Sequence, residues 1–199
     1  ISDEKIVVTN GNDFAFEASA TDATALKFHW ATNGVAVTDC TTSNFVGRVG
    51  EGTNTVSVYA EDAAGNVCDP VTRVWVVDTI DPTVPSLEGD PKDGAITQET
   101  GYSYTATSED ATIVTYYWTL NGGDEVAKNA GEAFADSGLA DGVYTVSVYA
   151  KDEAGNKSAA TNWTWTVDTT DPAELKLWGL PISDEKIVVT NGNDFAFEA

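Results

Sequence analysis

Hydrophobic and polar residues alternate along several short stretches of the chain, most clearly between Thr145 and Pro172. Val146, Val148 and Ala150 occupy every second position, which places their side chains on one face of a β-strand. The Ala-Gly-Asn segment that follows tolerates positive φ, so the chain can reverse direction there. Alternation then resumes over residues 163–167. The stretch therefore predicts a β-hairpin.

The same pattern occurs 90 residues earlier, between Thr55 and Pro82, and ten of the first twelve residues of the two stretches are identical. A repeat of this period indicates tandem modules. We expect a module lacking its first strand at residues 1–77, a complete module at 78–167 and the first strands of a further repeat at 168–199.

Residues 1–18 return unchanged at 182–199. A shared fold needs only a shared pattern, so full identity indicates a long tandem array whose repeating unit is a pair of modules. The chain contains no Met, and we interpret it as part of a longer polypeptide.

Other alternating stretches predict further strands. In the first module they cover residues 14–18, 26–30, 35–37, 55–60 and 72–77. In the second they cover residues 83–87, 102–106 and 114–118 and begin again at 144 and 161, with Gly89 and Pro91 ending or bending the first of them. Asn33-Gly34 and Asn121-Gly122 are strong signals for two-residue hairpins.

About seven short strands per module predict an all-β fold of tandem immunoglobulin-like antiparallel β-sandwiches. Trp30 and Trp118 lie in the middle of corresponding strands, as a core Trp does in such sandwiches. The segment ending at Tyr144 resembles the tyrosine corner of this fold. Asn54 stands at the corresponding place in the first module, so we expect that corner to be missing there.

The string T-V-x-V-x-A-x-D-x-A-G-N followed by V-D-T-x-x-P resembles bacterial immunoglobulin-like repeats of large secreted cell-surface adhesins. It occurs at residues 55–66 with 77–82 and at residues 145–156 with 167–172. The resemblance implies a structural role in a stalk or filament at the bacterial cell surface, outside the cell. It also implies neighbouring identical modules placed end to end, with calcium stiffening the joints between them.

The charge balance agrees with a cation partner. Asp and Glu number 32 against 10 Lys and Arg, which gives a net charge of −22. Such a surface repels nucleic acid and anionic lipid headgroups and attracts cations. No apolar run approaches the length of about 18 residues that a membrane-spanning segment needs, so we expect no membrane insertion.

Acidic residues recur where the predicted topology brings loops together. In a sandwich of this kind, the linker entering the second module and two of its loops meet at one pole. The residues there are Asp78 and Asp81 of the linker, Glu109 and Asp110 of one loop, and Asp152 and Asn156 of the other. Converging carboxylates suit Ca²⁺. The alternative is that Asp and Asn only stabilise tight turns.

The first module carries part of the same set in Asp22, Asp62 and Asn66. Its linker carboxylates would lie upstream of Ile1, so we expect this site to be incomplete here. Asp168 and Asp171 would serve the following module in the same way.

The two cysteines, Cys40 and Cys68, are expected at one end of the first module. A disulfide between them would close about 27 residues and stabilise the module by about 3 kcal/mol in the chain-entropy model. Such a bond suits an exported protein. The alternative is a pair of free thiols.

Catalysis has little support in the sequence. His29 is the only histidine, so no Ser-His-Asp or Cys-His set can be assembled. The carboxylates cluster in turns and not in a cleft, which argues against a glycosidase pair. We expect no enzyme activity.

Two other functions stay open. Six Trp and seven Tyr could bind a host or matrix glycan, although Trp30, Trp75, Trp118 and Trp165 are expected in the core. The aromatic residues expected outside the core are Tyr59, Tyr117, Tyr149 and Trp178. Residues 168–181 could also complete the first module of another chain, which would build a fibre by strand complementation between chains.

Overall fold

The computed structural model describes residues 7–176, which contain fifteen β-strands and no helix. No helix among them could therefore cross a membrane. Residues 7–168 belong to one compact unit, and a second unit begins at residue 169. In the second unit, residues 169–176 contain no strand. Trp178 and the duplicate of residues 1–18 at 182–199 lie outside the described residues.

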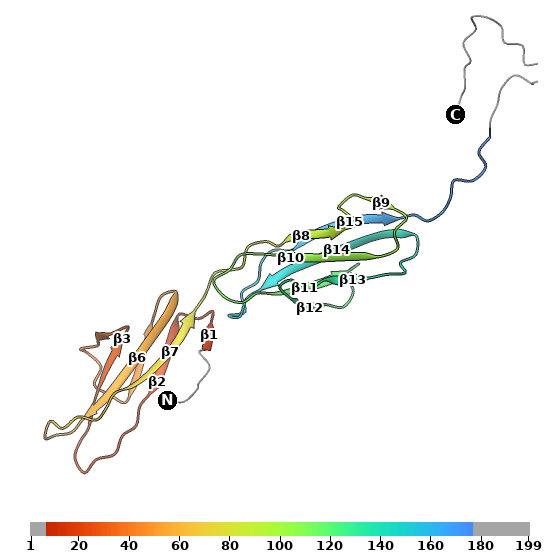
Figure 1. Cartoon of the computed structure of the whole chain (residues 1–199). Helices are drawn as coiled ribbons and strands as arrows, with labels where there is room; N and C mark the ends of the chain where they lie inside the picture. Colours follow the sequence, from red (N-terminus) through yellow and green to blue (C-terminus); the bar gives the residue numbers. More distant parts are fainter. Residues whose placement is uncertain (1–6, 177–199) are drawn as a thin grey trace, which may run out of the picture. The chain divides into compact units, whose positions relative to one another are not determined.

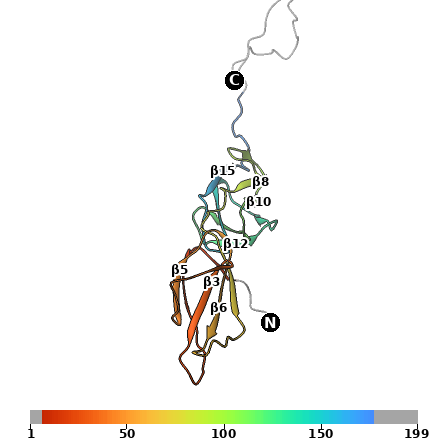
Figure 2. The same ribbon diagram turned by 90° about the vertical axis from the view of Figure 1, so that its left-hand side faces the viewer.

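The first seven strands form two sheets, ordered β1-β7-β6-β3-β4 and β2-β5. Figure 2 shows β5 apart from β3 and β6, which belong to the other sheet. The strands are β1 (Val7–Thr9), β2 (Asp13–Glu17), β3 (Lys27–Thr32), β4 (Val35–Ala36), β5 (Asn44–Arg48), β6 (Gly52–Glu61) and β7 (Val71–Val77).

The other eight strands form a second pair of sheets, ordered β13-β10-β8 and β12-β11-β14-β15-β9 (Figure 1). They are β8 (Ser86–Asp90), β9 (Ile96–Thr97), β10 (Tyr102–Thr107), β11 (Thr115–Leu120), β12 (Val126–Asn129), β13 (Phe134–Asp136), β14 (Gly142–Lys151) and β15 (Thr161–Val167). Most pairings are antiparallel, and only β1–β7 and β9–β15 are parallel. The predicted fold of immunoglobulin-like sandwiches is confirmed.

The predicted hairpin turns are present in both sandwiches. Asn33 and Gly34 have φ of 51° and 77°, and Asn121 and Gly122 have φ of 50° and 68°. Positive φ at both central residues defines a type I′ turn, whose twist matches that of the strands it joins. The Asn121 side chain also accepts a hydrogen bond from the Thr145 amide at 2.7 Å, which ties the turn to β14.

Alternation places large aromatic residues in the core of the second sandwich. Trp118, Trp165 and Tyr104 are almost fully buried there. In the first sandwich Trp30 is buried, whereas Trp75 is only partly buried against the core. The hydrophobic core is therefore more complete in the second sandwich.

The first strand of the second sandwich begins and ends later than predicted. It covers residues 86–90, in place of the predicted 83–87, and pairs with β10 through the Gly89 position. The chain then crosses to the other sheet, where β9 pairs in parallel with β15. Gly89 and Pro91 therefore lie at the crossing between the two sheets.

The tyrosine corner is confirmed in the second sandwich, where the Tyr144 hydroxyl donates to the Ala140 carbonyl at 3.0 Å. The first sandwich has no tyrosine corner, as expected, but Asn54 at the corresponding position makes a similar bond. The amide nitrogen of Asn54, which is 2% exposed, donates to the Gly50 carbonyl at 2.8 Å. In both sandwiches the acceptor lies four residues before the donor, so the shorter side chain makes the equivalent bond.

The expected disulfide is absent from the structure, in which Cys40 and Cys68 are free thiols. The Cys40 thiol donates to the Asn44 carbonyl at 3.3 Å, at the start of β5. The Cys68 sulfur accepts a hydrogen bond from the Ala60 amide at 3.2 Å, on β6 of the other sheet. Each side chain is directed to its own sheet, which explains why the two sulfurs are not joined.

Candidate metal centre

Three carboxylates meet at the start of the second sandwich. Asp78 directly follows β7, Asp110 lies in the loop between β10 and β11, and Asp152 directly follows β14. One oxygen of each lies within 4.8 Å of the others. This group is the one cluster of three or more potential metal ligands of the His, Cys, Asp and Glu types found in residues 7–176. We call it the Asp78 cluster.

The turn after β14 fixes the direction of Asp152. One of its carboxylate oxygens accepts hydrogen bonds from the amides of Gly155 at 2.6 Å and Asn156 at 2.8 Å. The other accepts from the side-chain amide of Asn156 at 2.7 Å. Gly155 has a φ of 101°, which a residue with a side chain rarely adopts. The turn therefore presents a pre-oriented, buried carboxylate.

Asp110 is held by its own loop in a similar way. One carboxylate oxygen accepts from the Thr112 amide at 2.8 Å and from the Thr112 hydroxyl at 2.9 Å. The sequence Asp-x-Thr thus forms a local cap that leaves the second carboxylate oxygen for another partner.

The backbone of Asp78 is hydrogen-bonded both to the first sandwich and to the turn after β14. Its amide donates to the Thr9 carbonyl at the end of β1, at 2.9 Å. Its carbonyl accepts from the Asn156 side chain at 2.8 Å. One carboxylate oxygen accepts from the Ile80 amide at 3.2 Å, while the other, Oδ2, is buried and has no hydrogen-bond partner.

An unpartnered carboxylate oxygen in this place is energetically costly. Asp78 is 3% exposed and Asp152 is 6% exposed. Among the described residues, no Lys or Arg forms an ion pair with any of the three carboxylates. Buried charges are normally paired or bound to a metal. A bound cation would compensate the charge of these carboxylates.

The geometry fits a calcium ion. Calcium takes six to eight oxygen ligands at about 2.3–2.6 Å, so oxygens on opposite sides of one ion lie about 5 Å apart. The spacing within the Asp78 cluster falls inside this limit. The three oxygens could supply part of such a ligand shell.

The other predicted ligands are placed differently. Asn156 uses its amide nitrogen to join Asp78 to Asp152, so it orients two ligands. Asp81 and Glu109 are exposed and lie outside the cluster. The backbone of Glu109 instead pairs with Thr83, through its carbonyl at 3.0 Å and its amide at 2.7 Å. Sequence reasoning could place these residues in the right loops but not fix their side chains.

The first sandwich repeats the two loops. Asp62 accepts from the amide and side chain of Asn66, and Asp22 accepts from the amide and hydroxyl of Thr24. The Asn66 side chain, followed by its amide, lowers the pKa of Asp62. Neither carboxylate belongs to a cluster of three within the described part of the chain.

The linker position is repeated after the second sandwich. The Asp168 amide donates to the Thr97 carbonyl at 2.9 Å, as the Asp78 amide donates to Thr9. Asp171, the counterpart of Asp81, is exposed in the same way. The backbone support of the linker carboxylate therefore recurs once per sandwich.

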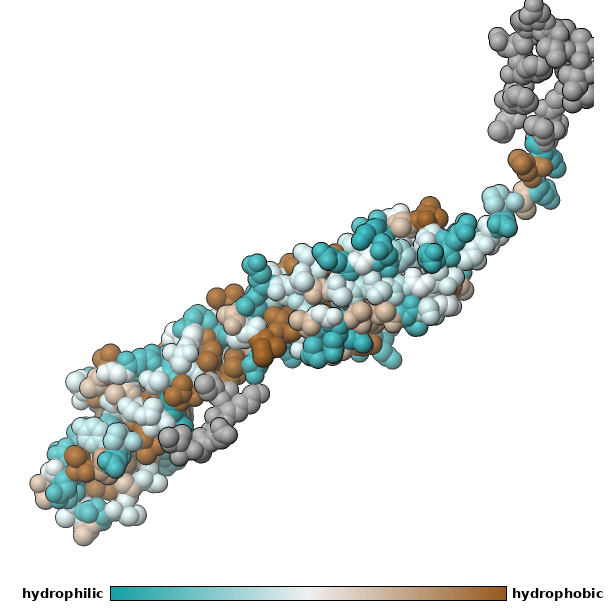
Figure 3. All heavy atoms as spheres, viewed as in Figure 1, coloured by the Kyte–Doolittle hydropathy of each residue, from teal (hydrophilic) through white to brown (hydrophobic). Residues whose placement is uncertain are grey.

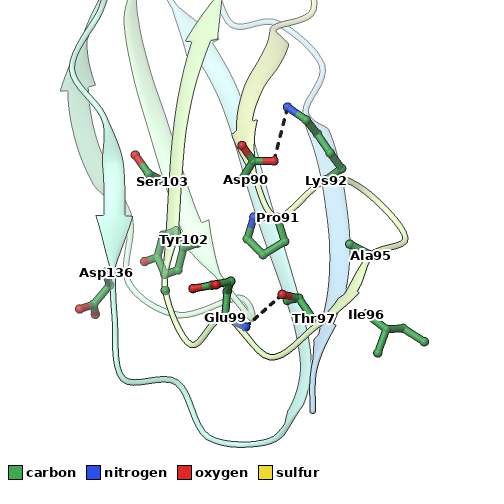
Figure 4. A pocket seen from close by; sticks show the side chains of 11 residues that line it. Asp90, Pro91, Lys92, Ala95, Ile96, Thr97, Glu99, Tyr102, Ser103 and Asp136 are labelled. Carbon is green, nitrogen blue, oxygen red and sulfur yellow. Dashed lines mark hydrogen bonds and ion pairs between the residues drawn. The ribbon is translucent and has the colours of Figure 1, made fainter. Parts of the chain in front are cut away.

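An open pocket of about 740 Å³ lies where the chain crosses between the sheets of the second sandwich. Figure 4 shows Lys92 paired with Asp90, at 3.8 Å, and the Asp136 carboxylate pointing away from both. Burial, followed by nearby Asp90, raises the pKa of Tyr104, whose hydroxyl donates to the Pro91 carbonyl at 2.7 Å. The polar groups of this pocket do not converge on a common point, in contrast to the Asp78 cluster.

The outward aromatic residues stack in pairs. Tyr117 and Tyr149 lie parallel with their ring centres 5.2 Å apart, and the Lys157 ammonium lies 5.0 Å from the centre of the Tyr149 ring. His29 stacks on Tyr59 and bonds Glu61 at 2.7 Å. The visible surface is otherwise mostly hydrophilic or near-neutral, with hydrophobic residues in small groups (Figure 3). These rings largely contact each other, which leaves less of their faces for a sugar.

Residues 80–169 match the family model of the bacterial Ig-like domain, so the resemblance predicted from the repeats is confirmed. Domains of this family are generally non-catalytic. A search of the curated proteins finds no match.

Several solved structures are similar to the chain. The fibronectin(III)-like modules of Clostridium thermocellum CbhA share 17% identity, with a TM-score of 0.48 over 83% of this chain and 92% of that one. An amphioxus IgVJ-C2 molecule shares 16% identity, with a TM-score of 0.40 over 81% and 99%. The Bacteroides ovatus SGBP-B, solved with a mixed-linkage heptasaccharide, shares 15% identity, with a TM-score of 0.33 over 81% and 42%.

Proposed function

We propose that these two sandwiches, the second of which is a bacterial Ig-like domain, belong to an extracellular stalk or filament whose joints are stiffened by calcium. The observation that carries this proposal is the Asp78 cluster, with its buried and unpartnered Asp78 oxygen. The partners are the neighbouring modules of the same array, at the bacterial cell surface. The role is mechanical, with no reaction catalysed.

The hydrogen bonds around the linker support this role. On one side the Asp78 amide bonds to Thr9, and both the amide and the hydroxyl of Thr79 donate to Glu51. On the other side the Asp78 carbonyl bonds to Asn156. A cation held by Asp78, Asp110 and Asp152 would add a charged link between the linker and both loops.

The chemistry of the site suits the environment outside cells. Extracellular calcium modules bind their ion with dissociation constants of about 10⁻⁴–10⁻³ M, because calcium is abundant there. Three carboxylates without a neighbouring cation give the charge that such a site needs. When calcium is removed, repulsion between them should loosen the linker.

Thermal unfolding with calcium and with a chelator tests the proposal. A ligand that binds only the folded state stabilises it by RT ln(1 + [L]/Kd), about 1.4 kcal/mol at ten times the dissociation constant. We expect calcium to raise the melting temperature of the parent chain and to have little effect on Asp78→Asn. In chelator, Asp78→Asn should melt above the parent, since it removes one of three repelling charges.

Asp62→Asn is the matched control. It removes a carboxylate from the same kind of loop in the first sandwich, outside the Asp78 cluster. This variant should keep the full response to calcium. A parent chain whose unfolding is the same with calcium and with chelator would overturn the metal site and leave the acidic residues as turn formers.

A further inference from the structure

Three Asn-Gly pairs lie within residues 7–176. They are Asn10-Gly11, Asn33-Gly34 and Asn121-Gly122. An Asn that precedes Gly can lose its side-chain amide without an enzyme, because glycine has no side chain to block the attack of its backbone nitrogen on the Asn side chain. In a folded protein, the rate of this reaction depends on how freely the two groups can move toward each other.

Two of the pairs are held by neighbouring strands. The Asn33 side chain accepts a hydrogen bond from the Thr55 amide at 2.8 Å and donates one to the Asn54 side chain at 2.9 Å. The Asn121 side chain accepts from the Thr145 amide at 2.7 Å. Moving either side chain toward the glycine that follows it therefore breaks bonds that tie a hairpin turn to a strand.

Asn10 is placed differently. It lies in the connection between β1 and β2 and is exposed. Its side chain forms no hydrogen bond to any of the residues that the structure describes. The Gly11 amide donates to the Thr9 hydroxyl at 3.1 Å. This bond to a side chain lies outside the sheets, so it can open without breaking a strand pairing.

The exposure belongs to this position of the fold. Thr9 and Thr97 each accept a hydrogen bond from the amide of the linker that leaves their sandwich. Asn10 and Gln98 directly follow these two threonines, and both are exposed. The exposed position therefore recurs in the second sandwich, where the preceding strand β8 is present.

We propose that Asn10 is a site of spontaneous deamidation. The Gly11 backbone nitrogen attacks the side-chain carbonyl carbon of Asn10, and the new bond closes a succinimide ring. The side-chain nitrogen leaves as ammonia and takes the proton of the Gly11 amide with it. Water then opens the ring at either carbonyl, which gives aspartate or isoaspartate.

The change falls directly beside the linker. The Thr9 carbonyl belongs to the same peptide group as the Asn10 nitrogen, and it accepts from the Asp78 amide at 2.9 Å. Both products add a negative charge next to this bond. Isoaspartate also lengthens the backbone between β1 and β2, because the chain then runs through the former side chain. Since the lost ammonia is not replaced, the modified fraction grows with the age of the protein.

Peptide mapping of the full chain after incubation at mildly alkaline pH tests the proposal. It is done in chelator, so that the outcome does not depend on the Asp78 cluster. Trypsin places the three pairs on separate peptides, at residues 6–27, 28–48 and 93–128. We expect deamidation at Asn10 to be about tenfold or more faster than at Asn33 or Asn121, which must first break hydrogen bonds. In urea the three rates should converge, because unfolding frees all three pairs.

Two variants check the chemistry. Asn10→Gln introduces the residue type of Gln98 and should lose the mass increase of deamidation on peptide 6–27. Gly11→Ala should slow the reaction by hindering the attacking nitrogen, and the added Cβ fits because it would lie 3.6 Å from the Thr9 hydroxyl oxygen. Equal rates at Asn10 and Asn33 in the folded chain would overturn the proposal, as would an unchanged rate in Gly11→Ala. Either result leaves the calcium proposal untouched.

Discussion

Asn54 shows how one residue can take over the task of a larger one. Its amide nitrogen donates to the carbonyls of Gly50 and Gly52, and its carbonyl accepts from the Asn33 side chain at 2.9 Å. Asn54 is only 2% exposed, so these hydrogen bonds are shielded from water. The residue therefore joins the start of β6 to the hairpin between β3 and β4.

We expect Asn54→Ala to destabilise the first sandwich by about 2–3 kcal/mol, because it leaves several polar groups buried and unpaired. Tyr144→Phe removes one hydrogen bond from a more exposed site in the second sandwich and should cost about 1 kcal/mol or less. Urea unfolding of both variants gives the two values. Equal losses would show that the additional buried hydrogen bonds of Asn54 do not stabilise the first sandwich.

Asp62 makes the first sandwich sensitive to acid. Hydrogen bonds from Asn66 lower its pKa below the ordinary value of 3.8. The unfolded chain therefore takes up a proton at a higher pH than the folded chain, and stability rises with pH between the two values. The stabilisation is present above pH 3.8 and is lost as the pH falls through the folded pKa.

Asp62→Asn should remove this contribution. We expect the urea midpoint of the variant to lie below that of the parent at neutral pH, with a gap that narrows as the pH falls below 3.8. Parallel urea titrations at pH 7 and pH 3 measure the gap. A gap of the same size at both values would rule out the carboxylate as its cause.

Among the elements, the long alternating strands were predictable, and so was the short β4 beside its Asn-Gly turn, whereas β1, β9 and β13 were not. In β6 and β14, three apolar residues occupy every second position. A β-strand is the conformation that places all three side chains on one face and so allows them to be buried together. The short strands β1, β9 and β13 contain two or three residues, which is too little for a periodic signal. Their positions depend on pairing with distant strands, which the sequence does not state.

The crossing between β8 and β9 depends on a glycine that sequence reasoning could only identify as a bend. Gly89 has a φ of 144° and lies against β10. We expect Gly89→Ala to destabilise the second sandwich by about 3 kcal/mol or more, because strain and overlap with the Ser103 carbonyl add together. Thermal or urea unfolding measures the loss.

Gly94 is the control for this substitution. Its φ is 75° and no atom lies within 4 Å of an added Cβ. Gly94→Ala should therefore cost only the conformational penalty of about 1–2 kcal/mol. If both variants lose the same stability, close packing at Gly89 is not what requires the glycine.

For the whole molecule, the candidate site was predictable as a set of loops but not as a set of ligands. The topology brings the linker and two loops to one pole, and three of the predicted residues, Asp78, Asp110 and Asp152, do meet there. Asp81 and Glu109 lie beside them in sequence and stay exposed, since the side-chain direction depends on local turns. The prediction of a disulfide was wrong for the same reason, because the side chains of Cys40 and Cys68 are each directed to a different sheet.

Small-angle scattering of the full chain measures directly whether calcium stiffens the joint. With calcium, the parent should give a sharper distribution of interatomic distances than in chelator, because the ion fixes the linker to the second sandwich. Asp78→Asn should give the broad distribution in both conditions, and Asp62→Asn should respond like the parent. Identical profiles for the parent with calcium and with chelator would contradict a joint stiffened by the ion.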